Sequence, residues 1–368
     1  MSYFEKVKGM LGFGCMRLPM NGDKVDYEQF CRMTDTFIEN GFNYFDTAHM
    51  YIDGKSETAI RDCVVKRHPR ESFVLTNKLS GPYFNSQEEI RPFFEKQLEL
   101  CGVEYFDFYL MHSQYDELFE KYKKCRAYET AFELKKEGKI KHVGISFHDR
   151  AEVLDKILTE YPDIEVVQIQ FNYLDYDDIN IQSKKCYDVC RKHNKPIMVM
   201  EPVKGGKLAN MPKEAQDIFD SVGNGSYAGY AIRFAAGFDG MFMILSGMSN
   251  MEQLEDNIQL VKNFEPLNSD EQQAVAKVTE ILKKQQIIPC TECRYCTEGC
   301  PANIAIPDIF SAYNELTARN EKANDMYISA VQAGGKASDC IQCGKCEEIC
   351  PQKLEIRHLL KKCKYNFE

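Results

Sequence analysis

The sequence predicts an α/β fold, in which a parallel (β/α)8 barrel is followed by a small domain of helices and cysteine-rich loops. Three observations indicate this fold. Short apolar runs recur along most of the chain, stretches with helical spacing separate them, and two cysteine runs of the same spacing stand near its end. A chain of 368 residues has room for a barrel of about 250 residues and an appended domain.

Eight apolar runs are expected to form the strands of the barrel. Each run is nearly continuous in apolar residues, which is typical of strands that are buried on both faces of a parallel sheet. The runs are residues 11–18, 42–48, 73–79, 106–112, 141–147, 166–172, 196–202 and 241–247.

The segments between these runs have the spacing of amphipathic helices. One of them, YEQFCRMTDTFIENG, ends at Gly41, and another, QEEIRPFFEKQLELCG, ends at Gly102. Glycine commonly terminates helices. The alternation of strands and helices predicts parallel βαβ units, and eight such units indicate a closed barrel rather than a doubly wound sheet.

We expect the barrel to occupy residues 1–267, a helical connector to occupy residues 268–287 and the cysteine-rich domain to occupy residues 288–368. The connector has an N-cap candidate in Ser269, followed by Gln272 three residues later. The stretch between the two cysteine runs predicts two further helices.

The composition argues against several kinds of partner. The formal net charge is -10 and the isoelectric point is about 5.4, whereas nucleic acids and anionic membranes attract clustered Lys and Arg. No run approaches the roughly 20 apolar residues of a membrane-spanning helix, and the N-terminal residues lack the apolar core of a signal peptide. We therefore expect a cytoplasmic protein that binds neither nucleic acid nor membranes.

The sixteen cysteines need an explanation in such a protein, because disulfides are uncommon in a reducing compartment. Cysteines outside the two runs are expected to be reduced and mostly to serve as small core residues. The runs themselves, CTECRYCTEGCP at 290–301 and CIQCGKCEEICP at 340–351, share the pattern Cys-x2-Cys-x2-Cys-x3-Cys-Pro.

In two-cluster ferredoxins this pattern binds 4Fe–4S clusters, and the fourth cysteine of each run binds the other run's cluster. Structural zinc is the alternative, but a zinc ribbon needs only two Cys-x2-Cys pairs. The helical stretch between the runs resembles an α-helical, ferredoxin-like domain. We predict two clusters: Cys290, Cys293, Cys296 and Cys350 bind the first, and Cys340, Cys343, Cys346 and Cys300 bind the second.

Polar residues end several of the apolar runs. In (β/α)8 barrels the active site lies at the carboxyl ends of the strands, so these residues are expected to face one another there. They are Asp46, Lys78, His112 and Ser146.

Motifs along the barrel resemble those of the aldo-keto reductase family. They are GFNYFDTAHMY followed by GKSE, then TNKL, DFYLMH, GKIKHVGIS and EPVKGGKL. The resemblance covers roughly residues 8–262 in the correct order. With the cysteine runs, the chain resembles the branch of that family with a C-terminal ferredoxin-type domain. It implies an oxidoreductase that acts on a small carbonyl or alcohol.

The family's catalytic tetrad matches Asp46, Tyr51, Lys78 and His112. Reduction of a carbonyl by hydride leaves an alkoxide that needs a proton, and a free tyrosine is a poor acid at neutral pH. A buried lysine cation beside it favours the phenolate and lowers its pKa. Tyr51 is then the general acid in reduction and the base in oxidation. Asp46 would hold Lys78 charged, and His112 would position the carbonyl oxygen.

The resemblance also implies contacts with NAD(H) or NADP(H). The family's usual Asn after Ser146 is Phe147 here, and its usual stacking aromatic is Met200. The family's cations for the 2′-phosphate fall on Gly247 and Gln253, which favours NADH unless Lys204 or Lys207 supplies the charge. The expected contacts are Ser146 and Gln168 with the carboxamide, Met200 with the ring, Gly205 and Gly206 with the pyrophosphate, Gln253 and Asn257 with the adenine, and Gly14, Met16 and Gly247 in the same site.

Nicotinamides pass two electrons together, whereas 4Fe–4S clusters pass one, so a direct exchange needs a converter such as a flavin. Three functions remain open. The first is a nicotinamide-dependent reductase whose clusters are structural or sense redox state. The second is a flavin- or ferredoxin-linked oxidoreductase, and the third is a redox-sensing binding module with a vestigial tetrad. The substrate, a redox partner protein and the oligomeric state are not readable from the sequence.

Overall fold

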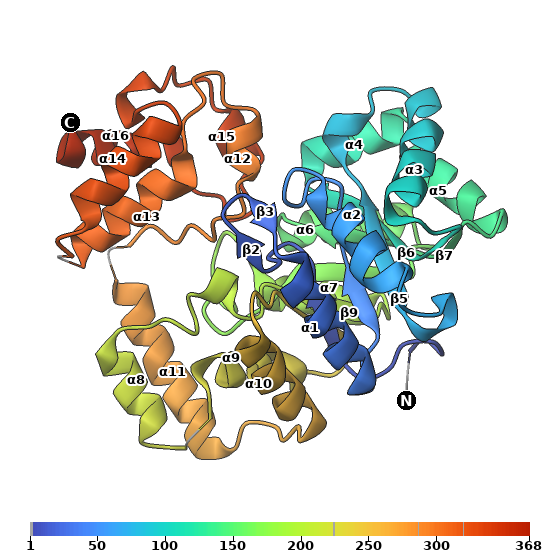
Figure 1. The fold of residues 1–368 in the computed structure, drawn as a ribbon, viewed down its shortest axis with the longest axis horizontal. Helices are drawn as coiled ribbons and strands as arrows, with labels where there is room; N and C mark the ends of the chain where they lie inside the picture. The colour runs from blue at the N-terminus through green and yellow to red at the C-terminus, as the bar shows by residue number, and fades with distance from the viewer. Residues whose placement is uncertain (1–2, 224, 286, 319) are drawn as a thin grey trace. The chain divides into compact units, whose positions relative to one another are not determined.

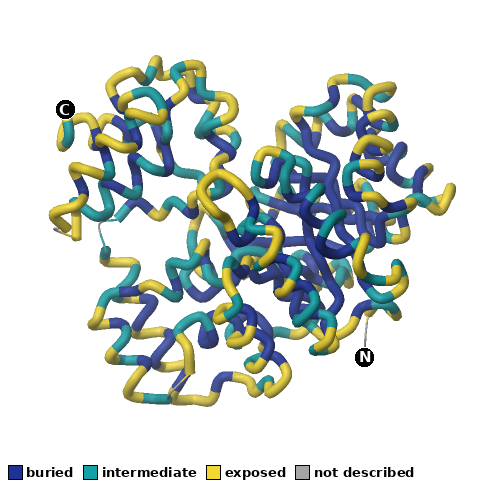
Figure 2. The backbone as a smooth tube through the Cα atoms, in the orientation of Figure 1, coloured by how far each residue is buried: buried dark blue, intermediate teal, exposed yellow. Residues whose placement is uncertain are grey.

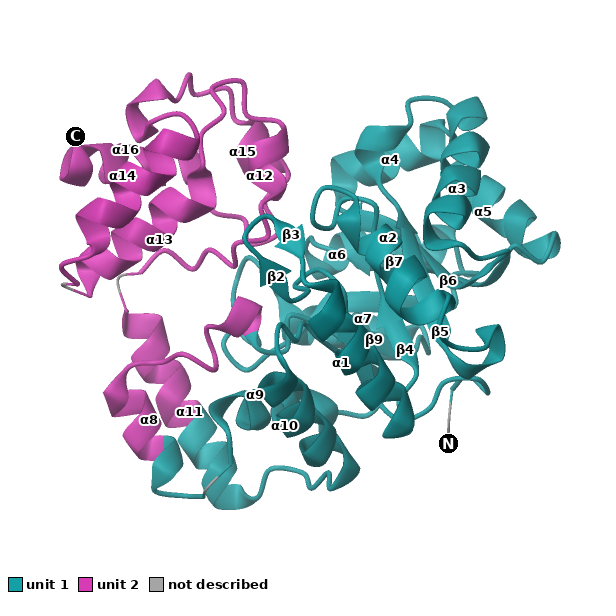
Figure 3. Cartoon of the chain, in the orientation of Figure 1, with its two compact units in different colours: residues 1–203, 219–275 teal, residues 204–218, 276–368 magenta. Residues whose placement is uncertain are grey.

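The chain folds as two compact units (Figure 3). The first comprises the residues through Val203 together with Phe219–Val275, and the second comprises Lys204–Ile218 and Ala276–Glu368. The domain boundaries at residues 267 and 288 stay predictions. The computed structural model describes residues 3–223, 225–285, 287–318 and 320–368.

The first unit contains the predicted barrel (Figure 1). Eight parallel strands close into a ring in the order β1-β10-β9-β8-β7-β6-β5-β4. Each of the apolar runs overlaps one of these strands, so the predicted fold class is confirmed. The strands are β1 (Leu11–Gly14), β4 (Tyr44–Asp46), β5 (Val74–Leu79), β6 (Phe106–Gln114), β7 (Ile140–Phe147), β8 (Val166–Gln170), β9 (Ile197–Met200) and β10 (Met241–Ser246).

Side chains along each strand alternate between two apolar layers. In β4, Tyr44 packs with Phe108 and Met198 inside the ring. The next residue, Phe45, belongs to the larger cluster between the strands and the helices. Burial on both faces explains why the strands are mostly apolar in sequence and why most of their length is buried, as the dark blue tube of the barrel shows in Figure 2.

Helices follow the strands of the first unit. Two of them end near the predicted glycines, which adopt left-handed backbone conformations: Gly41 follows the cap of α1 with φ 88°, and Gly102 caps α3 with φ 69°. In the described residues, no helix is both long and apolar enough to cross a membrane. The helices are α1 (Tyr27–Glu39), α2 (Lys55–Ile60), α3 (Gln87–Cys101), α4 (Asp116–Lys124), α5 (Ala127–Lys136), α6 (Ala151–Glu160), α7 (Ser183–Lys192), α9 (Tyr227–Ala236) and α10 (Met251–Lys262).

Three local features differ from the sequence-based expectation. A short antiparallel hairpin, β2 (Met20–Asn21) and β3 (Lys24–Val25), follows β1, and a π-helical turn, Arg61–Val65, continues α2. The connector helix α11 (Ser269–Lys284) is capped one residue earlier than predicted. Asn268 Oδ1 accepts from the backbone N–H groups of Asp270 and Glu271, and the Glu271 carboxylate accepts from the N–H of Asn268.

The second unit is helical around a small core of its own. Its core contains Ile304, Ile309 and Phe310, and also the cysteines Cys296 and Cys350. The two helices expected between the cysteine runs are α13 and α14. Helix α8 (Lys213–Asp220) crosses the boundary between the units. The remaining elements are η4 (Lys204–Gly206), α12 (Tyr295–Glu298), α13 (Ile306–Thr317), α14 (Ala323–Ala333), η5 (Ala337–Asp339), α15 (Lys345–Glu348) and α16 (Ile356–Phe367).

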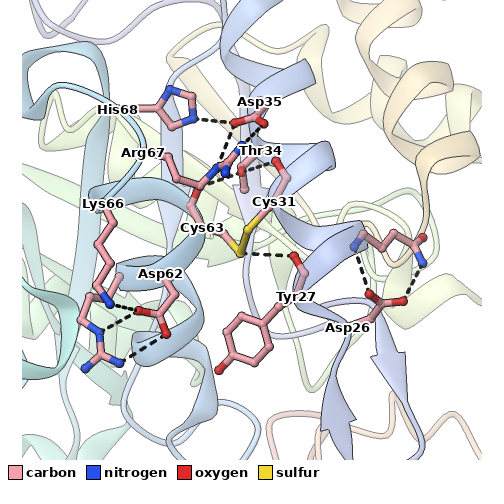
Figure 4. Close-up of a disulfide and its surroundings, with 12 residues drawn as sticks. Asp26, Tyr27, Cys31, Thr34, Asp35, Asp62, Cys63, Lys66, Arg67 and His68 are labelled. Carbon is pink, nitrogen blue, oxygen red and sulfur yellow. Dashed lines mark hydrogen bonds and ion pairs between the residues drawn. A yellow bond between two sulfur atoms is a disulfide. The ribbon is translucent and has the colours of Figure 1, made fainter.

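One pair of cysteines outside the runs corrects the expectation that they are reduced. Cys31 of α1 and Cys63 of the π-helical turn form a disulfide, with a Cα–Cα distance of 4.6 Å (Figure 4). Asp35 of α1 also pairs with Arg67 and His68, which follow the π-helical turn. The two cysteines are 32 residues apart, so only the packing of α1 beside the turn brings them together.

Candidate active site and cysteine cavities

Asp46, Lys78 and Tyr51 form one connected group at the carboxyl ends of β4 and β5. Lys78 Nζ lies 2.6 Å from Asp46 Oδ1, 3.0 Å from the Tyr51 hydroxyl and 2.8 Å from the carbonyl of Thr47. All three side chains are buried, and Lys78 is fully so. The ammonium group therefore directs its donors to a carboxylate, a phenol and a carbonyl.

Burial and pairing act in opposite directions on this group. Burial raises the pKa of Asp46, while Lys78 and the amide of Gln168 lower it. Burial likewise lowers the pKa of Lys78, and Asp46 opposes this shift. Because both groups are buried, each charge depends on the other, and the Tyr51 hydroxyl accepts a hydrogen bond from the Lys78 ammonium group.

His112, on β6, lies beside this group in neutral form. Its ring centroid is 6.1 Å from that of Tyr51. Burial, then the charges of Lys78 and His148, hold the pKa of His112 well below its usual value. Its Nδ1 lies 2.6 Å from the hydroxyl of Ser80, which is buried. When Ser80 donates this hydrogen bond, the ring proton lies on Nε2.

A buried network of polar side chains forms hydrogen bonds with the backbone of Lys78. Asn77 Oδ1 accepts a hydrogen bond from the backbone N–H of Lys78. Gln97 Nε2 donates to the backbone carbonyl of Lys78 at 3.1 Å. Glu57 accepts from Asn77 at 2.8 Å and pairs with His49 at 2.5 Å. We did not anticipate these residues or Ser80. Their signal in the sequence is weak: polar side chains at positions where a buried strand or the buried face of a helix is expected to be apolar.

The residues expected at the nicotinamide lie near the tetrad. Ser146 and Gln168 are paired across β7 and β8. The Ser146 hydroxyl accepts from the N–H of Ser113 at 2.7 Å, and Gln168 donates to Asp46 at 3.2 Å. Phe147 is buried, and Met200 is half-buried at the end of β9.

The residues expected at the adenine end follow β10 and begin α10. Asn257 donates to the Ser246 hydroxyl at 2.9 Å, and Gln253 accepts from the N–H of Ser249 at 2.8 Å. The side chain of Arg17 lies along Gly247, with atoms 3.4 to 3.7 Å from where a Cβ would be. These atoms are the aliphatic part of the Arg17 side chain, so the structure places an arginine beside Gly247.

Gly14, at the end of β1, lies beside the end of β10, since a Cβ on Gly14 would lie 3.2 Å from the carbonyl of Ser246. Met16 is half-buried and accepts from Arg17 at its sulfur. Gly205 and Gly206, which are expected at the pyrophosphate, lie within η4, in the segment that is grouped with the second unit.

The cysteines of the two runs line two separate cavities of the second unit. Within the described residues, no three potential ligands converge on a single metal ion. Burial raises the pKa of Cys290 and of Cys346 to about 11. One cavity is lined by Cys290, Cys293, Cys296 and Cys350, and the other by Cys300, Cys340, Cys343 and Cys346.

Comparisons with known proteins agree with both units. Residues 10–280 match the aldo/keto reductase family, and residues 289–354 match a 4Fe-4S dicluster domain. An uncharacterized oxidoreductase of Bacillus subtilis, YqkF, is 24% identical over 73% of this chain and 92% of its own length. The NADH-specific methylglyoxal reductase of Escherichia coli is 28% identical over 51% of this chain and 60% of its length.

Solved structures share the barrel. An aldo-keto reductase from Klebsiella pneumoniae in complex with NADPH superposes with a TM-score of 0.57 at 18% identity, and it covers 75% of this chain and 92% of that protein. The family match spans well over half of the sequence. This chain therefore belongs to the aldo/keto reductase family of oxidoreductases.

Proposed function

We propose that this protein reduces a small carbonyl compound, or oxidises the corresponding alcohol, with a nicotinamide cofactor, and that its C-terminal domain holds two 4Fe–4S clusters. The observation that carries the first part is the position of Lys78 Nζ, within hydrogen-bonding distance of both Asp46 and Tyr51. A buried lysine held in this way favours the negative charge that develops on a phenol oxygen as its proton leaves.

Each side chain of the tetrad has its own role in the proposed reaction. The cofactor, when bound, supplies or takes up a hydride. The Tyr51 hydroxyl donates its proton to the substrate oxygen in reduction and takes it back in oxidation. Lys78 stabilises the tyrosine oxygen while it carries the charge, and Asp46 offsets the cost of keeping Lys78 charged in a dry site. Neutral His112 donates a hydrogen bond from Nε2 to the same substrate oxygen, which orients the carbonyl for transfer.

Ser80→Ala is expected to lower kcat/KM about tenfold, because losing one hydrogen bond to His112 costs up to about 1.5 kcal/mol and leaves the ring tautomer unspecified. Steady-state kinetics measure this effect. Ser80→Thr keeps the hydroxyl and should restore most of the activity. Equal activity in wild type and Ser80→Ala would show that Ser80 does not position His112.

Arg17 is proposed to decide between NADPH and NADH. Lys204 and Lys207, the other candidates, donate to Gln352 and the carbonyl of Ile288 within the second unit, whereas Arg17 lies beside Gly247. Arg17→Gln is expected to weaken NADPH binding about tenfold, as for loss of a charged hydrogen bond, and to change NADH binding less than about twofold. Fluorescence titration with both cofactors measures the ratio, and a parallel loss for both would contradict the assignment.

The cysteine cavities fit iron–sulfur clusters by their donor set, since each cavity is lined by four thiols and thiolates are the ligands of 4Fe–4S clusters. When bound, such clusters exchange single electrons. The match to a 4Fe-4S dicluster domain supports the assignment. The second candidate function is one in which the clusters relay electrons to the barrel through a flavin.

Anaerobic purification tests both parts together. We expect a brown protein with about eight iron atoms per chain, as two four-iron clusters require, and oxidation of NADH or NADPH that depends on an added small aldehyde, with methylglyoxal among the probes. A protein that stays iron-free after anaerobic reconstitution would contradict the cluster assignment. Flavin in the purified protein, with electrons accepted from a reduced ferredoxin, would favour the second candidate.

A further inference from the structure

Strand β5 loses its neighbour on one side just before the active-site lysine. The last register pair between β4 and β5 is Asp46 with Thr76, and the carbonyl of Thr76 still accepts from the N–H of Thr47 at 2.9 Å. In a strand, the backbone groups of alternate residues point to the same side, so the N–H and the carbonyl of Lys78 also point toward β4. Since β4 ends at Asp46, these two groups need other partners.

Two amide side chains provide these partners. Asn77 Oδ1 accepts from the N–H of Lys78 at 2.8 Å, and Gln97 Nε2 donates to the carbonyl of Lys78 at 3.1 Å. Gln97 comes from helix α3 and also donates to Asn77 Oδ1 at 3.0 Å. All three residues are fully buried. Because a buried backbone group without a partner is costly, the two amides determine where the backbone of Lys78 lies.

The neighbours of the two amides decide which way each amide is turned, since an amide has a donor and an acceptor end. Glu57 Oε1 accepts from Asn77 Nδ2 at 2.8 Å and from Gln97 Nε2 at 3.2 Å. The hydroxyl of Tyr109 donates to Gln97 Oε1 at 2.5 Å. Glu57 and Tyr109 are also fully buried. Asn77 is thereby left to present its oxygen to the N–H of the lysine, and Gln97 its amino group to the carbonyl.

We propose that Gln97 is a positioning residue for the proton transfer of Tyr51. Glu57 and Tyr109 orient Gln97, and Gln97 in turn fixes the backbone from which the side chain of Lys78 extends. This inference rests on the proposed roles of Lys78 and Tyr51. The ammonium group lies 3.0 Å from the Tyr51 hydroxyl, and its attraction for a negative charge there falls with distance. A displaced backbone therefore weakens the stabilisation of the phenolate.

The test is the pH profile of carbonyl reduction by Gln97→Met, which removes the amide but changes neither the charge nor the length of the side chain. Reduction stops at the pH where Tyr51 loses its proton. A phenolate that is less well stabilised forms at higher pH, so we expect the half-point of this loss to rise by about one pH unit. We also expect kcat to fall about tenfold, with KM changed less than about twofold. Methylglyoxal with NADH or NADPH is the first probe.

Leu98→Ala is the matched control, because Leu98 is the next residue of α3 and is buried, but its side chain has no polar group. Its cavity should lower the unfolding temperature and leave the pH profile unchanged. Glu57→Gln keeps an oxygen that can accept from Gln97 and should stay close to wild type, whereas Glu57→Leu should resemble Gln97→Met. Equal behaviour of the two Glu57 variants would show that Glu57 acts through its charge and does not orient Gln97.

An unchanged pH profile and kcat in folded Gln97→Met would overturn the proposal, as would an equal shift in Leu98→Ala. If Gln97→Met does not fold, Tyr109→Phe provides the comparison, because it removes only the hydroxyl that donates to Gln97. A smaller shift of the same sign is then expected, and no shift overturns the proposal. Reduction by Tyr51→Phe at the wild-type rate would instead refute the proposed reaction, whatever the Gln97 variants show.

Discussion

Tyr51→Phe is expected to lower kcat for carbonyl reduction by about 10²–10⁴-fold, the usual contribution of general acid–base catalysis. The phenol hydroxyl is the only part of the side chain removed, and it lies 3.0 Å from Lys78 Nζ. The ring still fills the space beside His112, so the fold and the affinity for the cofactor should stay near those of wild type. Steady-state kinetics under anaerobic conditions, together with a cofactor titration, measure both quantities.

Lys78→Met is the companion variant, because it removes the ammonium group and leaves Asp46 buried without its cation. Its loss of activity should be similar, and the double variant should be little worse than either single one, since groups that act as one unit do not contribute additively. Undiminished reduction by Tyr51→Phe would show that another group delivers the proton. Additive losses would show that Lys78 does not act through Tyr51.

Replacing cysteines in pairs is expected to show that the two clusters share their ligands crosswise. If each run binds its own cluster, Cys290→Ala with Cys300→Ala removes two ligands of one cluster and leaves half of the iron. With crossed ligands, the same double variant damages both clusters, and little iron remains. The cavities favour the second outcome, because Cys300 lines the cavity of the second run and Cys290 does not.

The opposite pair provides the matched comparison. Cys290→Ala with Cys350→Ala should leave about half of the iron under crossed ligation and almost none otherwise. Cys363→Ala controls for the loss of a buried thiol, since Cys363 packs in the core of the same unit but lines neither cavity. Iron and sulfide analysis after anaerobic purification measures each variant. The reverse ranking of the two double variants would refute the crossed arrangement.

The barrel could be predicted from sequence because its signal is local. A strand buried on both faces must be apolar along its whole length, so each strand is visible as a run. Asp46, Lys78 and His112 could be expected at the active site because each ends an apolar run, whereas Tyr51 could be assigned only through resemblance, since it lies in a loop outside the strands. The role of Ser80 and the disulfide between Cys31 and Cys63 could not be predicted, because both depend on contacts between segments that are distant in sequence.

Cys296 and Cys350 belong at once to a cysteine cavity and to the small apolar core of the second unit. With the proposed clusters bound, iron binding and folding are expected to be one equilibrium in this domain, as in other small metal-dependent folds. Loss of the iron on exposure to oxygen is then expected to open the C-terminal domain to proteases, while the barrel, with a separate and much larger core, stays folded. The length of the surviving fragment would record past exposure to air.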